Sequence, residues 1–345
     1  MSENTLPKIS ASLVCYNGRA LIGRCLASVL AQDYPNLAVV VIDNNSSDGS
    51  ADYIRKNFPS VRLVEAGRNA GYSGGHNLGL RSTDSDFIWL LTQDLQVSPD
   101  YLRRVYERII LDDRIAGAQG KLLRFDPDDR SVYTIDSVGI CLNNSRRPHA
   151  LGQNEKDFGQ YAQAAEVWGL DGAAPLYRRA ALQDAAINGE VLDEDIFMYW
   201  DDIDISWRLR ARGWKLWYEP AAVAWHGRSA GASPGGYRKV FSLIRHRRRR
   251  LSLFAKKMSF KNNLLVLIKN DMGAPFWRAL PLILARLTAM LVYTILIEPK
   301  VLSVLPALFK QIPAALGKRR YVARHRRVSP EKVAGWFKSR AWGRD

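Results

Sequence analysis

Three aspartates stand close together in YWDDIDISWRLRARGW, residues 199–214. Asp201 and Asp202 are adjacent, and because adjacent carboxylates repel each other, one of them is harder to ionise than an isolated aspartate. Such a pair suits a site that must accept a proton near neutral pH. Asp204 is spaced for an i, i+4 ion pair with Arg208, which predicts a structural role. Asp202 has no such cationic partner on the predicted helix, so it is the better candidate for a general base.

Two further stretches could contact an anionic ligand. VIDNNSSDGS, residues 41–50, ends a predicted strand on Asp43, and its Asn and Ser residues cap the next predicted helix. RNAGYSGGHNLG, residues 68–79, has four glycines, which let a backbone approach a ligand and can place amides around a diphosphate ahead of a helix. Its spacing fits neither the dinucleotide fingerprint nor a P-loop. An ordinary turn and a flexible loop remain the alternatives for these two stretches.

Asp94 and His226 are candidate metal ligands. Asp94 ends the apolar run DFIWLLTQD, where a lone acid is unfavourable unless it is used. A divalent cation that bridges this carboxylate and substrate phosphates is the natural use. His226 ends the predicted strand AVAWHG and could be a second ligand, although a single histidine is more often structural.

The elements that must position these residues alternate along the chain. Short β-branched runs bounded by turn residues predict strands, with helices between them. The predicted strands are 8–16, 36–44, 61–66, 86–94 and 115–123, and the predicted helices are 18–31, 50–58 and 99–112. This order indicates an α/β fold with a mostly parallel sheet that helices cover on both faces. Ligands of such sheets bind at the carboxyl ends of the strands, where Asp43 and Asp94 are expected.

The rest of the chain predicts a loop-rich part, further strands and a tail. Residues 125–165 predict a loop or hairpin excursion, 166–179 a returning strand, 190–212 an acidic segment, and 214–220 and 221–227 two short strands. The Gly/Ser/Pro-rich stretch 228–237 marks the predicted boundary between a domain of residues 1–236 and a basic region of residues 237–345.

The charge is divided unevenly at this boundary. Residues 1–236 carry 25 basic and 30 acidic side chains, whereas residues 237–345 carry 25 basic and 4 acidic ones, a net charge of +21. Such a tail predicts an anionic partner, either nucleic acid or an acidic lipid surface. Its long aliphatic stretches with few aromatic residues fit lipid better than bases. The apolar run 279–297 contains Pro281 and Arg286, which favours an interfacial or re-entrant helix over a spanning helix or a soluble core.

The three cysteines, Cys15, Cys25 and Cys141, fit neither a disulfide framework nor a metal knuckle. This favours a reducing compartment. The opening MSENTLPKIS lacks the charged start and apolar core of a signal peptide.

Several motifs, taken in order, resemble the family-2 inverting glycosyltransferases of GT-A fold. CYNG, VIDNNSSDGS, NAGYSGGHNLG, DEDIFMYWDDIDISWRLRARGWK and WHGRS stand where that family has its counterparts, between about residues 8 and 230. The chain looks most like bacterial rhamnosyltransferase-type enzymes of cell-wall or O-antigen assembly. These take a dTDP-sugar and act on a polyprenyl-diphosphate-linked glycan at the cytoplasmic membrane face. Alternatives are a UDP-sugar transferase for galactofuranose or N-acetylhexosamine, a nucleotidyltransferase, a non-catalytic scaffold and a nucleic-acid-binding protein.

The resemblance also implies a role for each matching residue. Asp202 would be the catalytic base, with Asp201 beside it. Asp94 matches the second acid of the family's Asp-x-Asp metal motif, whose first acid is replaced by Thr92, and His226 matches a histidine that completes the metal site for Mn²⁺ or Mg²⁺. The implied nucleotide-sugar contacts are Tyr16, Asn17, Asp43, Asn45, Asn69, Gly71, Gly75, Asn77 and Gln93, and the implied acceptor contacts are Trp168 and Asp171. The oligomeric state is left open.

Overall fold

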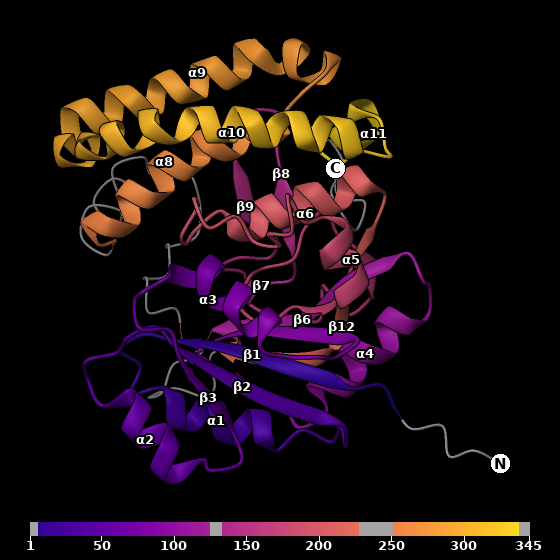
Figure 1. Cartoon of the computed structure of the whole chain (residues 1–345). Helices are drawn as coiled ribbons and strands as arrows, with labels where there is room; N and C mark the ends of the chain where they lie inside the picture. The colour runs from indigo at the N-terminus through magenta and orange to yellow at the C-terminus, as the bar shows by residue number, and fades with distance from the viewer. Residues whose placement is uncertain (1–5, 125–132, 228–250, 338–345) are drawn as a thin grey trace.

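The computed structural model describes residues 6–124, 133–227 and 251–337, which form two parts (Figure 1). The first part is a sheet with helices on both faces, and we call it the α/β unit. The second part consists of helices from residues 251–337 that lie along one side of the α/β unit, and we call it the helical layer. The predicted boundary at residue 236 and the basic run 245–250 lie outside the described residues.

The first half of the sheet is parallel, as the sequence predicts. Its strands are β1 (Ile9–Cys15), β2 (Leu37–Asp43), β3 (Arg62–Glu65) and β4 (Phe87–Thr92), in the order β3-β2-β1-β4. Helices α1 (Ile22–Leu30) and α4 (Tyr101–Ile110) pack on one face, and α3 (Gly71–Arg81), α5 (Arg179–Asp184) and α6 (Asp201–Arg212) pack on the other. Helix α2 (Ser50–Asn57) connects β2 to β3. The predicted coverage of both faces is therefore confirmed.

The second half of the sheet is mixed. Strand β11 (Leu176–Arg178) runs antiparallel between β4 and β6 (Ile115–Arg124), and β12 (Lys215–His226) runs parallel to β6. Strands β5 (Leu95–Val97), β7 (Ile135–Ser137) and β10 (Ala165–Glu166) extend this half, and β8 (Ile140–Leu142) pairs with β9 (Pro148–Ala150) in a separate hairpin. The prediction of a hairpin excursion within residues 125–165 is confirmed for its described part, residues 133–165.

One strand replaces the two that the sequence predicts within residues 214–227. The pairing of β12 with β6 shifts register between Glu219 and Val223 and then continues to His226. Pro220 lies in the irregular stretch, and because proline has no N–H to donate, a bulge is where a strand tolerates it. The proline therefore bends the strand without ending it.

The glycine-rich stretch forms most of helix α3 instead of a loop. Gly75 faces β1 so closely that a Cβ atom there would lie 2.8 Å from Val14 Cγ2, and a Cβ at Gly79 would collide with Ser12 Oγ. The missing side chains let the helix lie directly on the strand. The alternative of a flexible loop is therefore wrong.

Strand β4 ends at Thr92, so Asp94 lies in the turn between β4 and β5, whereas the sequence predicts it as the last residue of the strand.

The helical layer consists of α8 (Leu253–Asn270), α9 (Ala274–Ile297), the 3-10 helix η1 (Pro299–Val304), α10 (Leu305–His325) and α11 (Pro330–Gly335). Ile203 and Trp207 of α6 pack against Val266 of α8 and against Phe337, which follows α11. The face of α6 that does not cover the sheet is thus buried under the helical layer. Helix α6 therefore lies between the sheet and the added helices.

Candidate active site

A cavity of about 720 Å³ lies at the carboxyl edge of the parallel strands. Its walls come from the segments that follow β1 and β4, the N-terminal ends of α3 and α6, the end of β12, the β8–β9 hairpin and α8. Nine residues that the sequence singles out line it: Tyr16, Asn69, Gly71, Gln93, Asp94, Asp171, Asp201, Asp202 and His226. The fold therefore gathers most of the candidate residues around one space.

Asp201 and Asp202, which we call the acid pair, are the first two residues of α6. Both carboxylates thus lie at the positive end of the helix dipole. Asp201 is almost fully buried, and this burial, followed by the charge of Asp202, raises the pKa of Asp201 well above its usual range. Asp202 is less buried, and its Oδ1 accepts a hydrogen bond from Ile203 N at 2.8 Å. The repulsion expected from the sequence therefore falls on Asp201, while Asp202 is the more accessible carboxylate.

Asp204 has the structural role that its spacing predicts. Arg208 Nε donates to Asp204 Oδ2 at 2.9 Å, and both side chains are almost fully buried. Two groups of α8 also reach this carboxylate, since Lys269 Nζ lies 2.8 Å and Asn270 Nδ2 2.7 Å from Asp204 Oδ1. Asp204 therefore ties α6 to the helical layer.

His226 lies between two carboxylates at the end of β12. Its Nδ1 is 2.9 Å from Asp136 Oδ2, and its Nε2 is 3.4 Å from Asp94 Oδ1. Burial lowers the pKa of the imidazole, but the hydrogen bonds to Asp136 and Asp94 outweigh this effect and raise the pKa to about 10. Asp136 is fully buried, so it fixes the orientation of the ring, as outer carboxylates do for metal-binding histidines.

Asp94 and His226 fit a metal site that a substrate completes. Within residues 6–124, 133–227 and 251–337, no group of three or more His, Cys, Asp or Glu side chains is placed to hold a metal ion. Thr92, which lines the same cavity, supplies no carboxylate. Hard cations such as Mg²⁺ often bind through one or two protein carboxylates together with substrate phosphates and water. The two side chains therefore match such a cation once a diphosphate is bound and His226 has given up its proton, since only a neutral imidazole can ligate a metal.

Tyr16 and Gln93 join the ends of β1 and β4. Tyr16 N donates to Gln93 Oε1 at 2.9 Å, and Gln93 Nε2 donates back to Tyr16 O at 3.1 Å. The Tyr16 ring remains 46 % exposed at the rim of the cavity. These two hydrogen bonds fix the backbone of Tyr16 and leave its side chain exposed for contact with a ligand.

The end of β2 carries two buried acceptors that lack hydrogen-bond partners among the described residues, Asp43 Oδ1 and Asn44 Oδ1. Asp43 Oδ2 accepts from Ser46 N at 2.9 Å, and Asn44 Nδ2 donates to Gly71 O at 2.8 Å. Asn44 lines the cavity, whereas Asp43 does not. Because buried acceptors are nearly always satisfied, these two oxygens could accept hydrogen bonds from a ligand or from water.

The remaining candidates lie outside the cavity wall: Asn17, Asp43, Asn45, Gly75, Asn77 and Trp168. Asn17 and Asn45 adopt left-handed backbone in the turns after β1 and β2, with φ of 47° and 64°. Asn77 bonds both backbone groups of Leu192, which ties α3 to the segment ahead of α6. The Trp168 ring is buried against Trp207 and Phe337, so its contacts are structural.

Sequence reasoning missed several residues of the site. Asp136 stands in a polar, loop-like stretch where nothing distinguishes it from its neighbours. Tyr72 lines the cavity and donates its hydroxyl to Gly172 O at 2.7 Å, across 100 positions of the chain. Phe254 and Ser259 come from α8, within the tail that the sequence sets apart as a separate region. These contacts depend on tertiary packing and leave no local pattern.

Comparison with known proteins gives one family and a set of related folds. The model of the family "Glycosyl transferase family 2" matches residues 10–184. The poly-beta-1,6-N-acetyl-D-glucosamine synthase of Staphylococcus aureus (strain COL) is 26% identical over 234 residues, which is 65% of this chain and 51% of that protein. A similar synthase of Staphylococcus epidermidis is 24% identical over 224 residues, or 63% of this chain and 49% of that protein. The chain thus spans about half the length of the curated relatives it matches.

Solved structures share the fold at low sequence identity. Residues 1–349 of S. aureus TarS in complex with UDP superpose with a TM-score of 0.52 at 14% identity, covering 96% of this chain and 90% of that one. The mannosyltransferase PcManGT from Pyrobaculum calidifontis, solved with GDP-Man and Mn²⁺, gives a TM-score of 0.50 at 18% identity, covering 92% and 86%. Both similarities extend over the helical layer as well as the α/β unit. They establish the GT-A architecture.

Proposed function

The chain belongs to glycosyl transferase family 2, and on that premise we propose that it transfers a sugar from a nucleoside-diphosphate donor to a hydroxyl with inversion. The observation that carries the proposal is that the acid pair, Asp94 and His226 all line one cavity. A direct displacement needs a base and a diphosphate site within one space. These groups are sufficient for a direct displacement.

The acid pair supplies the proton acceptor. As an acceptor hydroxyl attacks the anomeric carbon, Asp202 takes its proton, the new C–O bond forms, and the bond from the anomeric carbon to the diphosphate oxygen breaks with its electron pair on the leaving group. Asp201, with its raised pKa, holds its proton to higher pH than an ordinary aspartate and can hydrogen-bond the acceptor. The two carboxyls therefore divide two tasks between them.

Asp94 and His226 would hold the divalent cation, Mn²⁺ or Mg²⁺, whose positive charge stabilises the negative charge on the departing diphosphate. Asp136 keeps the His226 ring in place through Nδ1, so that Nε2 is directed to Asp94. Asn44, which lines the cavity, offers an unpaired oxygen that suits an N–H group of a base, and Tyr16 lines the same cavity. Asp43, whose Oδ1 is also unpaired, precedes Asn44 at the end of β2. The donor would therefore span from β2 to the end of β12.

The donor sugar is the point on which the comparisons change the first expectation. The relatives above are named for N-acetylglucosamine, and TarS was solved with UDP, whereas none of the four proteins compared is named for rhamnose or dTDP. UDP-N-acetylhexosamine is therefore the first donor to test, and dTDP-rhamnose becomes the second. Both nucleotides carry a pyrimidine with one ring N–H, so Asp43 does not separate them.

We expect UDP to stabilise the full chain, and more strongly with Mn²⁺ than without it. A ligand present at about 100 times its dissociation constant adds about 2.7 kcal/mol to the free energy of unfolding. A thermal-shift series with UDP, dTDP, GDP and ADP, each with and without Mn²⁺, measures this directly. Asp94→Asn is the matched variant and should lose the Mn²⁺-dependent part of the shift.

The outcomes of this series separate the alternatives. A shift with dTDP alone would return rhamnose to the first place, and the transfer assay would then use dTDP-rhamnose. The absence of a shift with every nucleotide would contradict the donor site. Transfer of N-acetylhexosamine from the UDP donor to a lipid-linked glycan, followed by mass spectrometry of the product, then tests the reaction itself.

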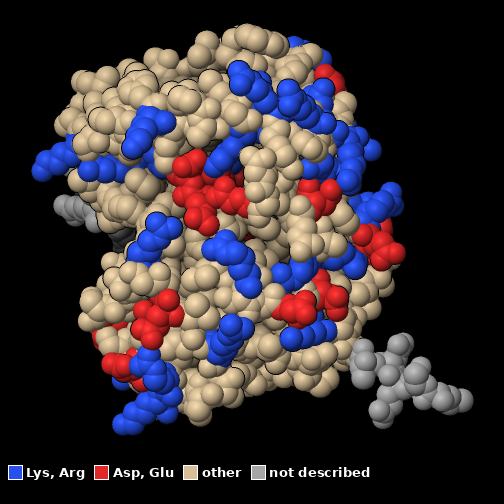
Figure 2. Space-filling view, viewed as in Figure 1, with Lys and Arg blue, Asp and Glu red and all other residues tan. Residues whose placement is uncertain are grey.

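Helix α9 supports a second part of the proposal, attachment to a membrane. Among the described residues, it is the one helix long and apolar enough to cross a membrane. An 18-residue window of this helix has a mean hydropathy of 2.1, and only 11% of the window is buried. Exposed apolar side chains recur along its outer face, at Leu284, Leu291 and Ile295 and beside them at Leu282, Val292 and Leu296. Figure 2 shows the outer surface of the helical layer, at the top of the view, largely free of charge, with basic side chains on its flanks.

Arg286 indicates how α9 meets the membrane. Its Nε donates to Ser145 O at 2.7 Å and its Nη2 to Asn263 Oδ1 at 3.1 Å, so the guanidinium faces the protein. A helix that is anchored by its polar side and apolar on its outer side suits the interface plane better than a crossing of the bilayer. We therefore propose a peripheral or re-entrant location at the cytoplasmic face, next to a polyprenyl-diphosphate-linked acceptor. The three cysteines are free, which fits the reducing conditions of the cytoplasm.

The double variant Leu284→Glu and Leu291→Glu is expected to weaken binding to anionic vesicles by about 100-fold, because each buried Leu contributes about 1.5–3 kcal/mol. Flotation of the purified chain with vesicles that contain phosphatidylglycerol measures the loss. Leu30→Glu with Leu111→Glu is the matched control, since both leucines are exposed on the α/β unit. Equal flotation of the two double variants would contradict the assignment of the outer face of α9 to lipid.

A further inference from the structure

The segment Asp193–Trp200, which we call the acidic loop, leads directly into the acid pair. Three of its residues other than glycine adopt left-handed backbone: Phe197, Tyr199 and Trp200, with φ of 67°, 64° and 73°. Such residues are strained and persist only where their surroundings hold them, often at active sites. All three line the cavity. The conformation of the acidic loop therefore decides where α6 begins and where its two carboxylates point.

Asn262 of α8 holds this loop from the helical layer. Its side chain is fully buried, and its Nδ2 lies within hydrogen-bond distance of three carbonyl oxygens, those of Ile196 at 2.8 Å, Met198 at 2.9 Å and Tyr199 at 2.9 Å. An amide nitrogen has two hydrogens, so these carbonyls share two donors. A single side chain thus gathers the carbonyls on both sides of Phe197.

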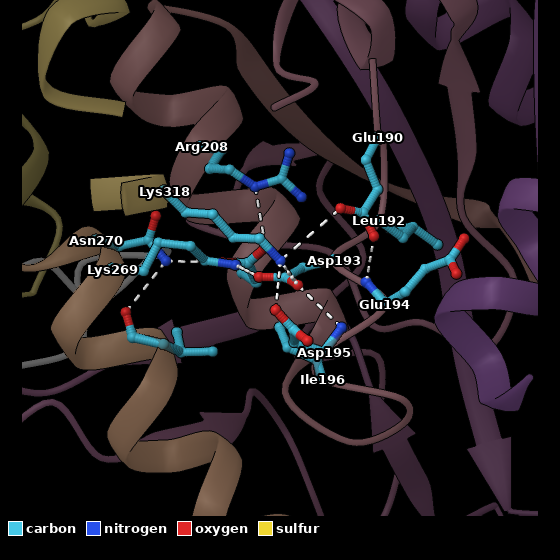
Figure 3. Close-up of polar contacts among 12 residues, drawn as sticks. Glu190, Leu192, Asp193, Glu194, Asp195, Ile196, Arg208, Lys269, Asn270 and Lys318 are labelled. Atoms are coloured by element: carbon cyan, nitrogen blue, oxygen red, sulfur yellow. Dashed lines mark hydrogen bonds and ion pairs between the residues drawn. The ribbon is translucent and has the colours of Figure 1, made fainter. Parts of the chain in front are cut away.

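Lysines of the helical layer fasten the start of the same loop. Figure 3 shows Lys269 of α8 and Lys318 of α10 directed at Asp193, which both contact. Lys318 Nζ also lies 2.8 Å from Asp195 Oδ2, and Lys261 Nζ donates to Asp195 O at 2.7 Å. Every anchor of the loop in this set comes from α8 or α10.

We propose that the helical layer is a positioning part of the catalytic site, which acts through Asn262 on the acidic loop and so places the acid pair. This inference rests on the proposed glycosyl transfer. Simple packing of two layers would not require a buried amide aimed at three carbonyls of a strained turn. The layer that meets the membrane would then also set the geometry of the base.

The test replaces Asn262 by aspartate, which has the same shape but, when ionised, no hydrogen to donate and a charge that repels carbonyl oxygens. For Asn262→Asp we expect kcat to fall by about 100-fold, since a misplacement of about 1 Å can cost that much. The KM for the donor and the affinity for the nucleotide should stay near wild type, because the proposed donor contacts lie at the ends of β1, β2, β4 and β12. A loss in kcat without a change in KM marks positioning of the reacting groups.

Asn263→Ala is the matched control on the same helix. Asn263 is equally buried, but its Nδ2 donates to Met290 Sδ of α9 and its Oδ1 accepts from Arg286, so it faces away from the loop. This variant should lose thermal stability while it keeps wild-type kcat. If Asn262→Asp does not fold, Asn262→Ser, which can reach fewer of the carbonyls, replaces it. Wild-type kcat in either folded Asn262 variant, or an equal loss of kcat in Asn263→Ala, would overturn the inference.

Hydrogen exchange separates this inference from the proposed function. In Asn262→Asp the amides of residues 196–200 should exchange faster than in Asn263→Ala, whether or not a donor sugar has been identified. Unchanged exchange in that segment would overturn the positioning role by itself. A wild-type chain that transfers no sugar would instead contradict the proposed function, and the exchange result would still stand.

Discussion

Asp202→Asn is expected to lower the rate of sugar transfer by about 1000-fold, within the range of about 10²–10⁴ for loss of a general base. The carboxylate at the cavity accepts the acceptor proton, and an amide of the same shape has no basic oxygen to take it. Nucleotide affinity should remain near that of the wild type, because the nucleotide contacts belong to other elements. Initial rates with saturating donor, together with thermal shifts by UDP, measure the two properties separately.

Asp201→Asn is the control at the neighbouring position. Because burial and the charge of Asp202 raise the pKa of Asp201, its carboxyl resembles an amide over a wider pH range than an ordinary aspartate does. A group whose pKa is raised on folding costs stability as the pH rises above its unfolded value, so this variant should gain more stability at pH 8 than at pH 5. Its rate should fall far less than that of Asp202→Asn. Transfer by Asp202→Asn within about tenfold of wild type would remove Asp202 from the role of base.

The sequence predicts the α/β unit well where each strand is a short apolar run. The runs that contain β1, β2 and β4 stand out because these parallel strands are mostly buried. It fails at α3 because glycines normally disfavour helices, and the gain from close packing of Gly75 on Val14 is visible only in three dimensions. It also divides β12 in two at Pro220, since a bulge depends on the neighbouring strand.

In the candidate site too, the sequence identifies residues that carry a local motif and misses those that depend on tertiary packing. Motifs that end strands or begin helices identify Asp94, His226 and the acid pair, which the structure brings together in one cavity. The family resemblance implies that Trp168 contacts the acceptor, but its ring packs beneath the helical layer, where aromatic side chains fill the core. Asp136 and Asn262 could not be found from the sequence, because each acts on a residue more than 60 positions away.

The composition of the tail does not show which of its basic residues lie inside the protein. Its charge and apolar runs predict a region separate from the first 236 residues. In the described part of that tail, however, polar residues reach into the α/β unit. The buried Lys261, Asn262, Lys269 and Asn270 and the partly buried Lys318 all bond residues between Asp193 and Asp204. A basic residue that neutralises a buried acid cannot be told from a surface one by counting charges. Part of the excess positive charge therefore serves the interior.

Lys269→Met is expected to lower the free energy of unfolding by about 3 kcal/mol, the lower end of the range of about 3–5 kcal/mol for removing one partner of a buried ion pair. Lys269 is almost fully buried, contacts Asp193, and lies 2.8 Å from Asp204 Oδ1. Burial raises the pKa of Asp193, but the two lysines outweigh it and hold this pKa well below its usual range. Without Lys269, Asp193 keeps Lys318 and Asp204 keeps Arg208, which is why the loss stays moderate.

Thermal or urea unfolding of the full chain at pH 7 measures this loss of stability. The control is Lys310→Met, the same change at an exposed site of α10. If both variants unfold like the wild type, the ion pairs of Lys269 and Lys318 shown in Figure 3 do not hold the helical layer on the α/β unit.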